Sequence, residues 1–270
     1  SGRGIETRPF PLDRRYQIDD FCGRRALRML RSFPKDTPWF FQVNWASAHP
    51  PFDAAASLVA RYAGITFPLP IDSEDNVTNH QKVRRQVAAM LEGMDEWMGR
   101  ILQAVADRGN PSDTVVVYSA DHGEMLGDHN RWNKGVPLEP SVHIPLLVQG
   151  PGLAQGSRTD ALVELCDLAG TFLDLAGIKA PNDWDARSLV PVLRQKTDRH
   201  RSFSVSALGQ WTMGFDGRYK YVEQQGEATH LFDLETDPFE RRNLLAAYPD
   251  RARHLKKRLR RELAHRAQSC

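Results

Sequence analysis

Near the middle of the chain, an acidic residue and a histidine follow an apolar segment. Thr114 to Tyr118 is rich in β-branched residues, and Asp121-His122-Gly123 comes shortly after it. Such runs are typical of buried strands, and ligands of open α/β sheets bind beyond the carboxyl ends of the strands. Aspartate offers oxygen and histidine nitrogen to a divalent cation, while glycine allows a sharp turn. The tripeptide therefore fits a metal-ligand pair, although a turn capped by Asp121 beside a surface histidine fits it equally well.

The residues around this tripeptide form a longer pattern that favours the metal site. Tyr118 to Gly135 reads YSADHGEMLGDHNRWNKG. This block resembles the sulfatase family of the alkaline-phosphatase-like superfamily, which often shows Ser-Asp-His-Gly-Glu-Met-Leu-Gly-x-His followed by Lys. Three further segments resemble the same family in the same order: Pro38 to Phe52 with its His49-Pro50-Pro51, Val142 to Gly152, and Tyr219 to Leu244.

The resemblance assigns roles to five residues. Asp121 and His122 match the second pair of divalent-metal ligands, and the metal is usually calcium. Because histidine is an unusual ligand for a hard cation such as Ca²⁺, magnesium and manganese stay open as alternatives. His49 and Lys134 match the residues that contact the sulfate oxygens or the leaving oxygen, so they are the expected catalytic residues. His129 is expected to contact the substrate or to orient its loop.

These residue types suit the cleavage of a sulfate ester. Negative charge gathers on the oxygens as the ester bond breaks, and a cation with lysine and histidine donors stabilises that charge. A protonated His49 can also assist departure of the alkoxide as a general acid. Taken singly, His49 fits a solvated loop residue and Lys134 a surface lysine. Only their places in the family pattern favour a role in the site.

The nucleophile of the family is missing from this pattern. The resemblance implies an Asp-Asp pair on a first strand and a Cys-x-Pro/Ala-x-Arg motif whose cysteine is oxidised to formylglycine. In Cys22-Gly23-Arg24-Arg25-Ala26, Arg24 stands where Pro or Ala is needed and Ala26 where Arg is needed. No apolar strand precedes Asp19-Asp20 beside it. We therefore expect a fragment or truncated form that begins after the nucleophile region and is inactive by itself.

The other two cysteines give no alternative nucleophile. Cys166 is expected in the core within a helix, and Cys270 is terminal. The three cysteines are widely spaced, so we expect neither a disulfide framework nor a cysteine metal site.

Alternating strands and helices are expected to position these residues. Strand-length segments are predicted at 39–45, 114–118 and 143–148, helices at about 19–33, 79–107 and 162–175, and a stop at Gly109-Asn110-Pro111. Short alternating segments between 202 and 234 predict an antiparallel sheet, and a basic helix follows at about 249–267. We predict an α/β fold with a partial, mostly parallel sheet flanked by helices, and a small C-terminal antiparallel sheet plus helix subdomain. The expected domains are 1–199, the C-terminal part of a catalytic domain, and 200–270.

Charge and hydropathy narrow the range of partners. The 270 residues carry 36 Lys and Arg against 34 Asp and Glu, so we expect no nucleic-acid partner. No segment resembles a transmembrane helix, and the stripe of Leu255, Leu259 and Leu263 in the basic terminal helix is expected to pack on the body rather than on a membrane. A partial sheet would expose apolar surface, which favours a homo-oligomer. The first residues do not resemble a signal peptide, and the location, cytoplasm or periplasm, stays open.

Three functions follow from these observations. The first is metal-dependent hydrolysis of a sulfuric ester, carried by a small molecule or a saccharide. The second is hydrolysis of a phosphoester or phosphonate ester, because related members of the superfamily share Asp-His-Gly and a metal. The third is a catalytically silent binding protein that keeps half of an active site.

Overall fold

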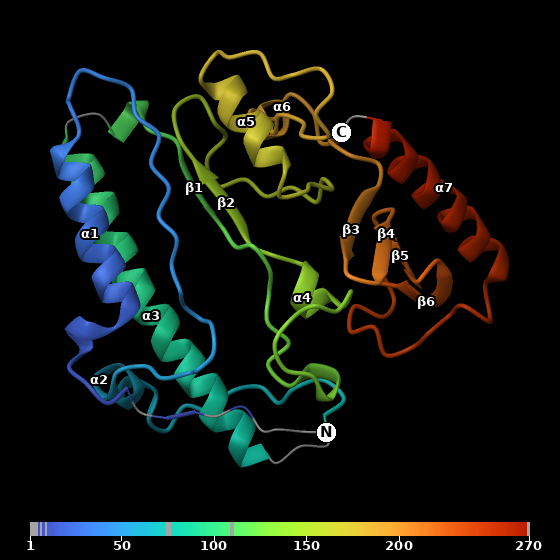
Figure 1. The fold of residues 1–270 in the computed structure, drawn as a ribbon, viewed down its shortest axis with the longest axis horizontal. Helices are drawn as coiled ribbons and strands as arrows, with labels where there is room; N and C mark the ends of the chain where they lie inside the picture. Colours follow the sequence, from blue (N-terminus) through green and yellow to red (C-terminus); the bar gives the residue numbers. More distant parts are fainter. Residues whose placement is uncertain (1–4, 6, 9, 74–76, 109–110, 269–270) are drawn as a thin grey trace. The chain divides into compact units, whose positions relative to one another are not determined.

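The computed structural model describes the chain except residues 1–4, 6, 9, 74–76, 109–110 and 269–270 (Figure 1). The predicted helix stop at Gly109-Asn110 and the terminal Cys270 lie outside the described residues. The chain forms two compact units: unit 1 is Ser1–Thr114 with Leu126–Trp132, and unit 2 is Val115–Met125 with Asn133–Cys270. The predicted domain boundary at residue 199 stays a prediction.

Unit 1 is helical in its described part. Its elements are α1 (Ile18–Ser32), α2 (Ala56–Val59), α3 (Val77–Asp107) and short 3-10 helices at Arg14–Tyr16, Ala60–Tyr62, Pro111–Asp113 and Asp128–Asn130. The helices predicted at about 19–33 and 79–107 are present as α1 and α3.

The two long helices of unit 1 pack against each other (Figure 1). Gly23 of α1 allows the close approach, because a Cβ at this position would overlap with the ring of Trp97 on α3. Further along, Leu30 of α1 is buried with Ala104 and Val105 of α3. The apolar faces read from helical periodicity therefore form this interface.

The aromatic segment at 39–45 differs from the prediction of a strand. It has no regular secondary structure, and its side chains alternate between half-buried and exposed, with Phe40 68% exposed. Trp39 and Phe41 pack against the cluster around Leu30. No sheet of the described chain includes this segment. An extended segment becomes a strand only where a neighbour supplies peptide groups in register, and side-chain alternation alone does not provide that neighbour.

The segment Leu126–Trp132 belongs to the core of unit 1. Phe52 on the loop after His49 is fully buried with Val83 of α3, and Leu126 and Trp132 pack against them. The Trp132 ring also stacks on the buried His80 of α3, with ring centroids 5.1 Å apart. Part of the Asp-His-Gly block is thus fastened to α3.

Unit 2 contains two sheets and four helices within its described residues. The elements are β1 (Val116–Ser119), α4 (Glu139–Val142), β2 (Leu146–Gln149), α5 (Asp167–Leu175), α6 (Val190–Leu193), β3 (Ser204–Leu208), β4 (Trp211–Phe215), β5 (Tyr219–Gln224), β6 (Glu227–Asp233) and α7 (Pro249–Gln268). The α/β class and the small C-terminal antiparallel sheet are confirmed.

The expected parallel pairing is wrong for the two strands that flank the Asp-His-Gly block. β1 and β2 pair antiparallel, with Val116 opposite Gln149 and Ser119 opposite Leu146. A parallel pair needs a crossover that runs back along the sheet, usually as a helix. The connection between β1 and β2 holds only the short helices Asp128–Asn130 and α4, so β2 starts at the end of the sheet where β1 stops.

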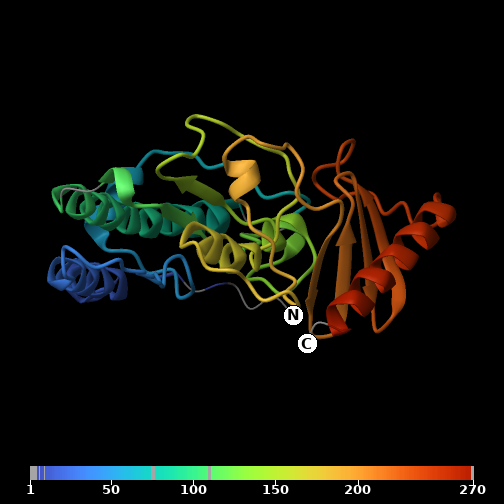
Figure 2. The same ribbon diagram turned by 90° about the horizontal axis from the view of Figure 1, so that it is seen from above.

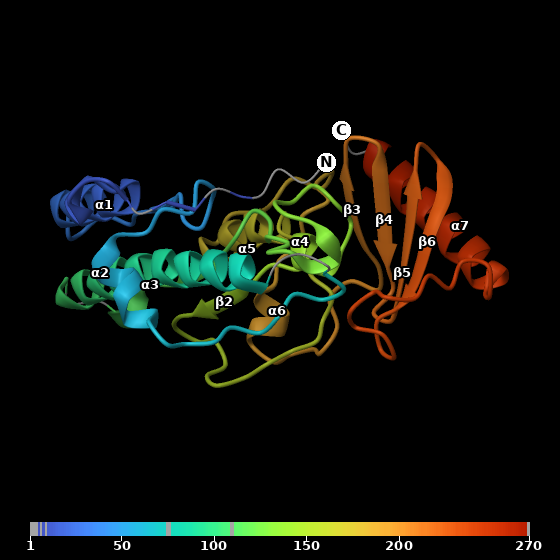
Figure 3. The same ribbon diagram turned by 90° about the horizontal axis from the view of Figure 1, so that it is seen from below.

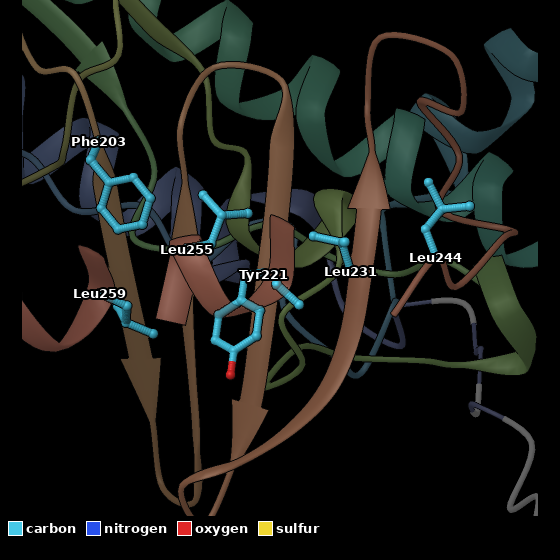
Figure 4. Packing of buried hydrophobic residues seen from close by; sticks show 7 residues of the cluster. Phe203, Tyr221, Leu231, Leu244, Leu255 and Leu259 are labelled. Atoms are coloured by element: carbon cyan, nitrogen blue, oxygen red, sulfur yellow. The ribbon is translucent and has the colours of Figure 1, made fainter. Parts of the chain in front are cut away.

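The four-stranded sheet has the order β3-β4-β5-β6, with antiparallel neighbours (Figure 3). Helix α7 lies across one face of this sheet (Figure 2). Leu255 and Leu259 of α7 are fully buried with Phe203 and Tyr221 (Figure 4). Leu263 is partly buried and packs against the same cluster. The predicted packing of the leucine stripe is confirmed. No helix of the described residues is long and apolar enough to span a bilayer.

A buried ion pair joins α5 to the start of the four-stranded sheet. Asp167, the first residue of α5, is fully buried and accepts hydrogen bonds from Arg201 and from Nε2–H of His200, the latter at 3.0 Å. Burial alone would raise its pKa, but the hydrogen bonds from Arg201 and His200 hold the pKa of Asp167 well below its usual range. Helix α5 therefore begins at this anchor, later than the predicted residue 162.

Cys166 corrects a further prediction. It is exposed at the N-cap of α5 rather than buried inside a helix. Partial desolvation of the sulfur and the neighbouring charge of Asp167 raise the pKa of the thiol to about 11. Among the described residues, Cys22 and Cys166 are free thiols.

Candidate metal and sulfate site

The Asp121–His122 turn follows β1 and offers two donor atoms side by side. Oδ1 of Asp121 accepts the backbone N–H of His122 at 2.9 Å. Nδ1 of His122 lies 2.9 Å from the carbonyl oxygen of Gly123. Because a carbonyl oxygen only accepts, Nδ1 carries the proton and Nε2 keeps its lone pair. That Nε2 lies 3.5 Å from Oδ2 of Asp121.

This geometry fits two ligands of one cation. Metal–oxygen and metal–nitrogen bonds of about 2.0–2.6 Å allow two donors 3.5 Å apart to reach the same ion. A ligating histidine commonly donates its other N–H to a carbonyl or carboxylate, as His122 does to Gly123. No group of three or more His, Cys, Asp or Glu side chains in the described chain is arranged to hold a metal. The turn therefore presents two side chains that are close enough to share a cation, and metal binding by Asp121 and His122 stays a prediction.

Gly123 fixes the turn against α4. Its N–H donates to the carbonyl of Ser141 at 2.9 Å, and a Cβ at this position would overlap with the carbonyl oxygen of Pro140. The glycine is thus required by the close approach of two backbones, and not by its own φ angle. The direction of the two ligands depends on where α4 sits.

Lys134 lies on a second turn that is attached to the same helix. The N–H of Gly135 donates to Oγ of the buried Ser141 at 3.2 Å. Asn133 and Gly135, on either side of Lys134, have positive φ angles of 65° and 92°. The Lys134 ammonium makes no ion pair or hydrogen bond with another side chain of the described residues. A half-buried lysine with no charged partner in the described part of the chain can bind an anion.

Glu124 and Met125 close the base of the loop that separates the two turns. The N–H of Met125 donates to the carbonyl of Asn133 at 2.9 Å, and Oε1 of Glu124 accepts the N–H of Asn133 at 2.5 Å. Met125 is almost fully buried. These contacts tie Lys134 to the metal-ligand turn within unit 2.

A buried carboxylate holds the residues just before His49 in unit 1. Asp19 accepts the backbone N–H groups of Ala46 at 2.9 Å and Ser47 at 3.3 Å, and also the Ser47 hydroxyl. Asp19 lies in the first turn of α1, whose N-cap residue is Gln17. Sequence reasoning missed this contact, because it joins residues far apart in the chain.

His49 itself is exposed and has a defined tautomer. Its N–H donates to the carbonyl of Ala46 at 3.0 Å, and Nδ1 donates to the carbonyl of Pro50 at 2.7 Å. Nε2 is therefore the ring nitrogen that is left to exchange a proton with a ligand or with solvent. An imidazole with this arrangement can donate a proton from Nε2 when it is charged.

His129 is positioned by neighbours within unit 1. Asp128 accepts the N–H of Ile71 at 2.9 Å and a hydrogen bond from Arg84 at 3.3 Å, and the N–H of His129 donates to the carbonyl of Ile71 at 2.7 Å. Nδ1 of His129 lies 3.9 Å from Oδ2 of Asp72, and its side chain is 17% exposed. Asp128 holds the loop in place, while substrate contact by His129 stays a prediction.

Cys22 lies on α1 and is half-buried. Burial and the nearby charge of Asp19 raise the pKa of its thiol. A raised pKa disfavours the thiolate, which is the reactive form of cysteine. This environment agrees with the expectation that Cys22 is not the nucleophile.

The structure brings three of the predicted residues onto neighbouring turns of unit 2: Asp121, His122 and Lys134. His49 and His129 belong to unit 1. Sequence reasoning also missed a buried charge cluster behind α4, formed by Lys220, Glu139 and Glu240. The sequence offered one sign of this cluster, namely a lysine, Lys220, at a position of the segment 219–222 that becomes buried.

Known proteins resemble the chain over most of its length. The Sulfatase family model matches residues 5–178, and the model for N-sulphoglucosamine sulphohydrolase, C-terminal, matches residues 127–269. Arylsulfatase K of Xenopus laevis is 32% identical over 195 residues, which cover 66% of this chain and 36% of that protein. An arylsulfatase of Clostridium perfringens (strain 13 / Type A) is 27% identical over 295 residues, covering 96% of this chain and 60% of that protein.

Solved structures share the fold. BT4656 in complex with D-glucosamine-2-N,6-O-disulfate superposes with a TM-score of 0.84 at 17% identity, covering 93% of this chain and 70% of the other. The phosphonate monoester hydrolase from Silicibacter pomeroyi gives a TM-score of 0.83 at 24% identity, covering 99% and 65%. The chain spans between about a third and three fifths of the two arylsulfatases it matches. The family model covers well over half of the residues, and the chain belongs to the sulfatase family.

Proposed function

We propose that this chain supplies half of the metal site and two anion-contacting side chains of a metal-dependent sulfuric ester hydrolase. The observation that carries the proposal is the 3.5 Å separation of Asp121 Oδ2 and His122 Nε2, with Nδ1 of the histidine engaged by a carbonyl. Family membership supports it, and the two donor atoms suit calcium, magnesium or manganese. A bound cation would stabilise negative charge on the sulfate oxygens.

Lys134 and His49 are proposed as the groups that act on the ester. The ammonium of Lys134 would donate to a sulfate oxygen. His49 would hold a proton on Nε2 and give it to the leaving oxygen, since Nδ1 is committed to the carbonyl of Pro50. His129 is proposed to contact the substrate or to keep the loop in register through its neighbour Asp128.

The nucleophile is not supplied by this arrangement. The family's formylglycine motif is absent around Cys22, whose thiol pKa is raised. We propose that the chain alone binds a metal and an anion but does not turn over an ester. A catalytically silent binding protein would behave in the same way, and the proposal describes that behaviour for the isolated chain.

The proposed substrate class is a sulfated saccharide or a small sulfate ester. A structural neighbour was solved with D-glucosamine-2-N,6-O-disulfate, which is a sulfated sugar. A second candidate is a phosphonate monoester, because hydrolases of that class share the fold with 24% identity. Both ligands are anionic esters, so the ligand test must include one of each.

Self-association is a further proposal, supported by one exposed apolar stripe. Ile18, Phe21 and Met29 of α1 are 56%, 53% and 48% exposed and lie on one side of the helix. Exposed apolar patches often mark association surfaces. Sedimentation velocity over a range of concentrations tests this, and a monomer at every concentration would remove the proposal.

Ligand titration tests the proposed function. With Ca²⁺ present, phenyl sulfate and a phenylphosphonate monoester are titrated into the wild type and into Lys134→Ala, with Lys179→Ala at an exposed lysine as the control. We expect Ca²⁺-dependent binding of the sulfate ester that Lys134→Ala weakens about 10-fold and the control does not. Tighter binding of the phosphonate ester would favour the second candidate. Equal binding without Ca²⁺, or by Lys134→Ala, would contradict the proposal.

A further inference from the structure

A fully buried lysine stands on β5 behind the metal-ligand turn. Lys220 is 0% exposed, and its Nζ lies 2.7 Å from Oε1 of Glu240 and 2.5 Å from Oε1 of Glu139. Its neighbour Tyr221 faces α7, so Lys220 points to the opposite face of the sheet. An ammonium in such a place is retained only with charged partners and hydrogen bonds, because its desolvation is costly.

Two contacts of this charge cluster hold Glu139, the first residue of α4. The side chain of Glu139 binds Lys220, and the backbone N–H of Glu139 donates to Oε2 of Glu240 at 2.7 Å. The ammonium also donates to the carbonyl of Pro137 at 3.3 Å. Helix α4 lies beside the four-stranded sheet in Figures 1 and 3. The charge cluster therefore fixes where this short helix starts.

Helix α4 in turn determines the positions of both turns that carry site residues. Gly123 donates to Ser141 and has no room for a Cβ next to Pro140, and Gly135 donates to Oγ of Ser141. The path from β5 to the ligand pair thus consists of direct contacts within unit 2: Lys220 to Glu139, α4 to Gly123, and Gly123 to His122.

We propose that Lys220 and Glu240 are positioning residues for the Asp121–His122 metal pair, acting through α4. The inference rests on the proposed function, since it requires that this pair binds a cation. Removing the charge of Lys220 lets α4 shift. Gly123 moves with it, because its backbone packs directly against the backbone of Pro140. The distance between His122 Nε2 and Asp121 Oδ2 then changes from 3.5 Å, and the pair binds a cation less tightly.

A second buried charge on β5, paired with a half-exposed arginine, provides the control. Glu223 is almost fully buried and binds Arg260 of α7 at 2.9 Å, on the path to α7 instead of α4. Glu223→Gln removes a buried charge from the same strand without touching α4. A variant that only destabilises the sheet should behave like this control.

The test measures Mn²⁺ binding by broadening of the His122 ring resonances in the labelled full chain, at a temperature where every variant is folded. We expect Lys220→Met and Glu240→Gln to weaken the apparent Mn²⁺ affinity about 10-fold, Lys220→Arg to recover most of it, and Glu223→Gln to match the wild type. Wild-type affinity in Lys220→Met and Glu240→Gln would overturn the positioning role.

Exchange of the Gly123 amide gives a second readout that needs no metal. Because this N–H is bonded to Ser141, we expect Glu240→Gln to accelerate its exchange with solvent, and Glu223→Gln to leave it unchanged. This milder variant also serves if Lys220→Met does not fold. Unchanged exchange in Glu240→Gln would contradict the proposal. If the wild type shows no Mn²⁺ broadening at all, the proposed metal pair itself fails, and a changed Gly123 exchange then reports only a structural link.

Discussion

In unit 1, the residues just before His49 are held by hydrogen bonds to the Asp19 carboxylate. In unit 2, the Asp121–His122 turn is held by a series of backbone contacts that ends in a buried charge cluster. In unit 1, Asp19 accepts two backbone N–H groups and a hydroxyl directly before His49. In unit 2, Gly123 rests on α4, and α4 rests on Lys220 and Glu240. In both units, buried charged side chains support a segment whose candidate site residue is exposed: His49 in unit 1 and Asp121 in unit 2.

The difference has a physical consequence. A segment held by hydrogen bonds to one side chain should loosen when that side chain is changed, while the unit around it stays folded. A turn held by two closely packed backbones tolerates no added atom, because a backbone carbonyl cannot move aside as a flexible side chain can. The following predictions separate these two kinds of support.

Gly123→Ala is expected to have the largest effect. The added methyl meets the carbonyl of Pro140, so α4 or the ligand turn must shift, at a cost of about 3 kcal/mol in the free energy of unfolding. Metal binding at Asp121–His122 should be lost as well. Denaturant unfolding and Mn²⁺ titration check both effects.

Gly99→Ala is the control, since a Cβ at this position of α3 meets no atom within 4 Å. We expect it to raise stability slightly, by the helix propensity difference of about 0.5–1 kcal/mol. If Gly123→Ala is as stable as Gly99→Ala, the tight packing against α4 is not real.

Asp19→Asn should be next in size. It replaces a buried charged acceptor of two backbone N–H groups and a hydroxyl, for which a loss of about 2 kcal/mol is expected. The amides of Ala46 and Ser47 should exchange faster, while Mn²⁺ binding in unit 2 stays at the wild-type level. Amide exchange and urea unfolding measure the two parts.

Asp13→Asn is the matched control for Asp19, because Asp13 also accepts a backbone N–H but is exposed. Its effect on stability should stay below about 1 kcal/mol. Equal effects of the two substitutions would show that Asp19 is an ordinary surface acceptor.

A smaller effect concerns pH and leaves both site segments untouched. Hydrogen bonds from Arg201 and His200 hold the pKa of Asp167 below its usual range. Asp167 is therefore protonated at a lower pH in the folded state than in the unfolded state. The stability that Asp167 contributes is present above the unfolded pKa of about 4 and is lost progressively below it. Thermal unfolding of the wild type should show this slope.

Asp167→Asn should be less stable than the wild type at neutral pH and should show a shallower decline in acid. Mn²⁺ binding at neutral pH should change little, because this ion pair lies on a different path from α4. A wild-type curve that is flat between pH 6 and 3 would contradict the role of the Asp167–Arg201 pair.

Much of the architecture could be predicted from periodicity. The long amphipathic segments gave α1, α3 and α7, and short alternating segments gave the four-stranded sheet. Pairing could not be predicted in the same way: β1 and β2 read as buried parallel strands, yet their connection lacks the long helix of a crossover. Residues 39–45 alternate as a strand does, but no described strand pairs with them.

In the candidate site, the residues of the local motif could be predicted from the sequence, whereas the residues that support them could not. Asp121, His122 and Lys134 could be chosen from the motif because they occur close together in the sequence. The supports could not be chosen. Asp19 is 28 residues from Ser47, and Lys220 reads as one more lysine in an alternating strand until the fold places Glu139 and Glu240 around it. Local sequence patterns contain no signal for such long-range contacts.

Titration of histidine-labelled protein with Mn²⁺, followed by Ca²⁺ as competitor, tests directly whether Asp121 and His122 bind a cation. We expect the His122 ring resonances to broaden first, the His200 ring beside Asp167 to stay sharp, and Ca²⁺ to reverse the broadening. Asp121→Asn should remove the selectivity. Equal broadening of all exposed histidines, or an unchanged response in Asp121→Asn, would contradict a metal pair at Asp121 and His122.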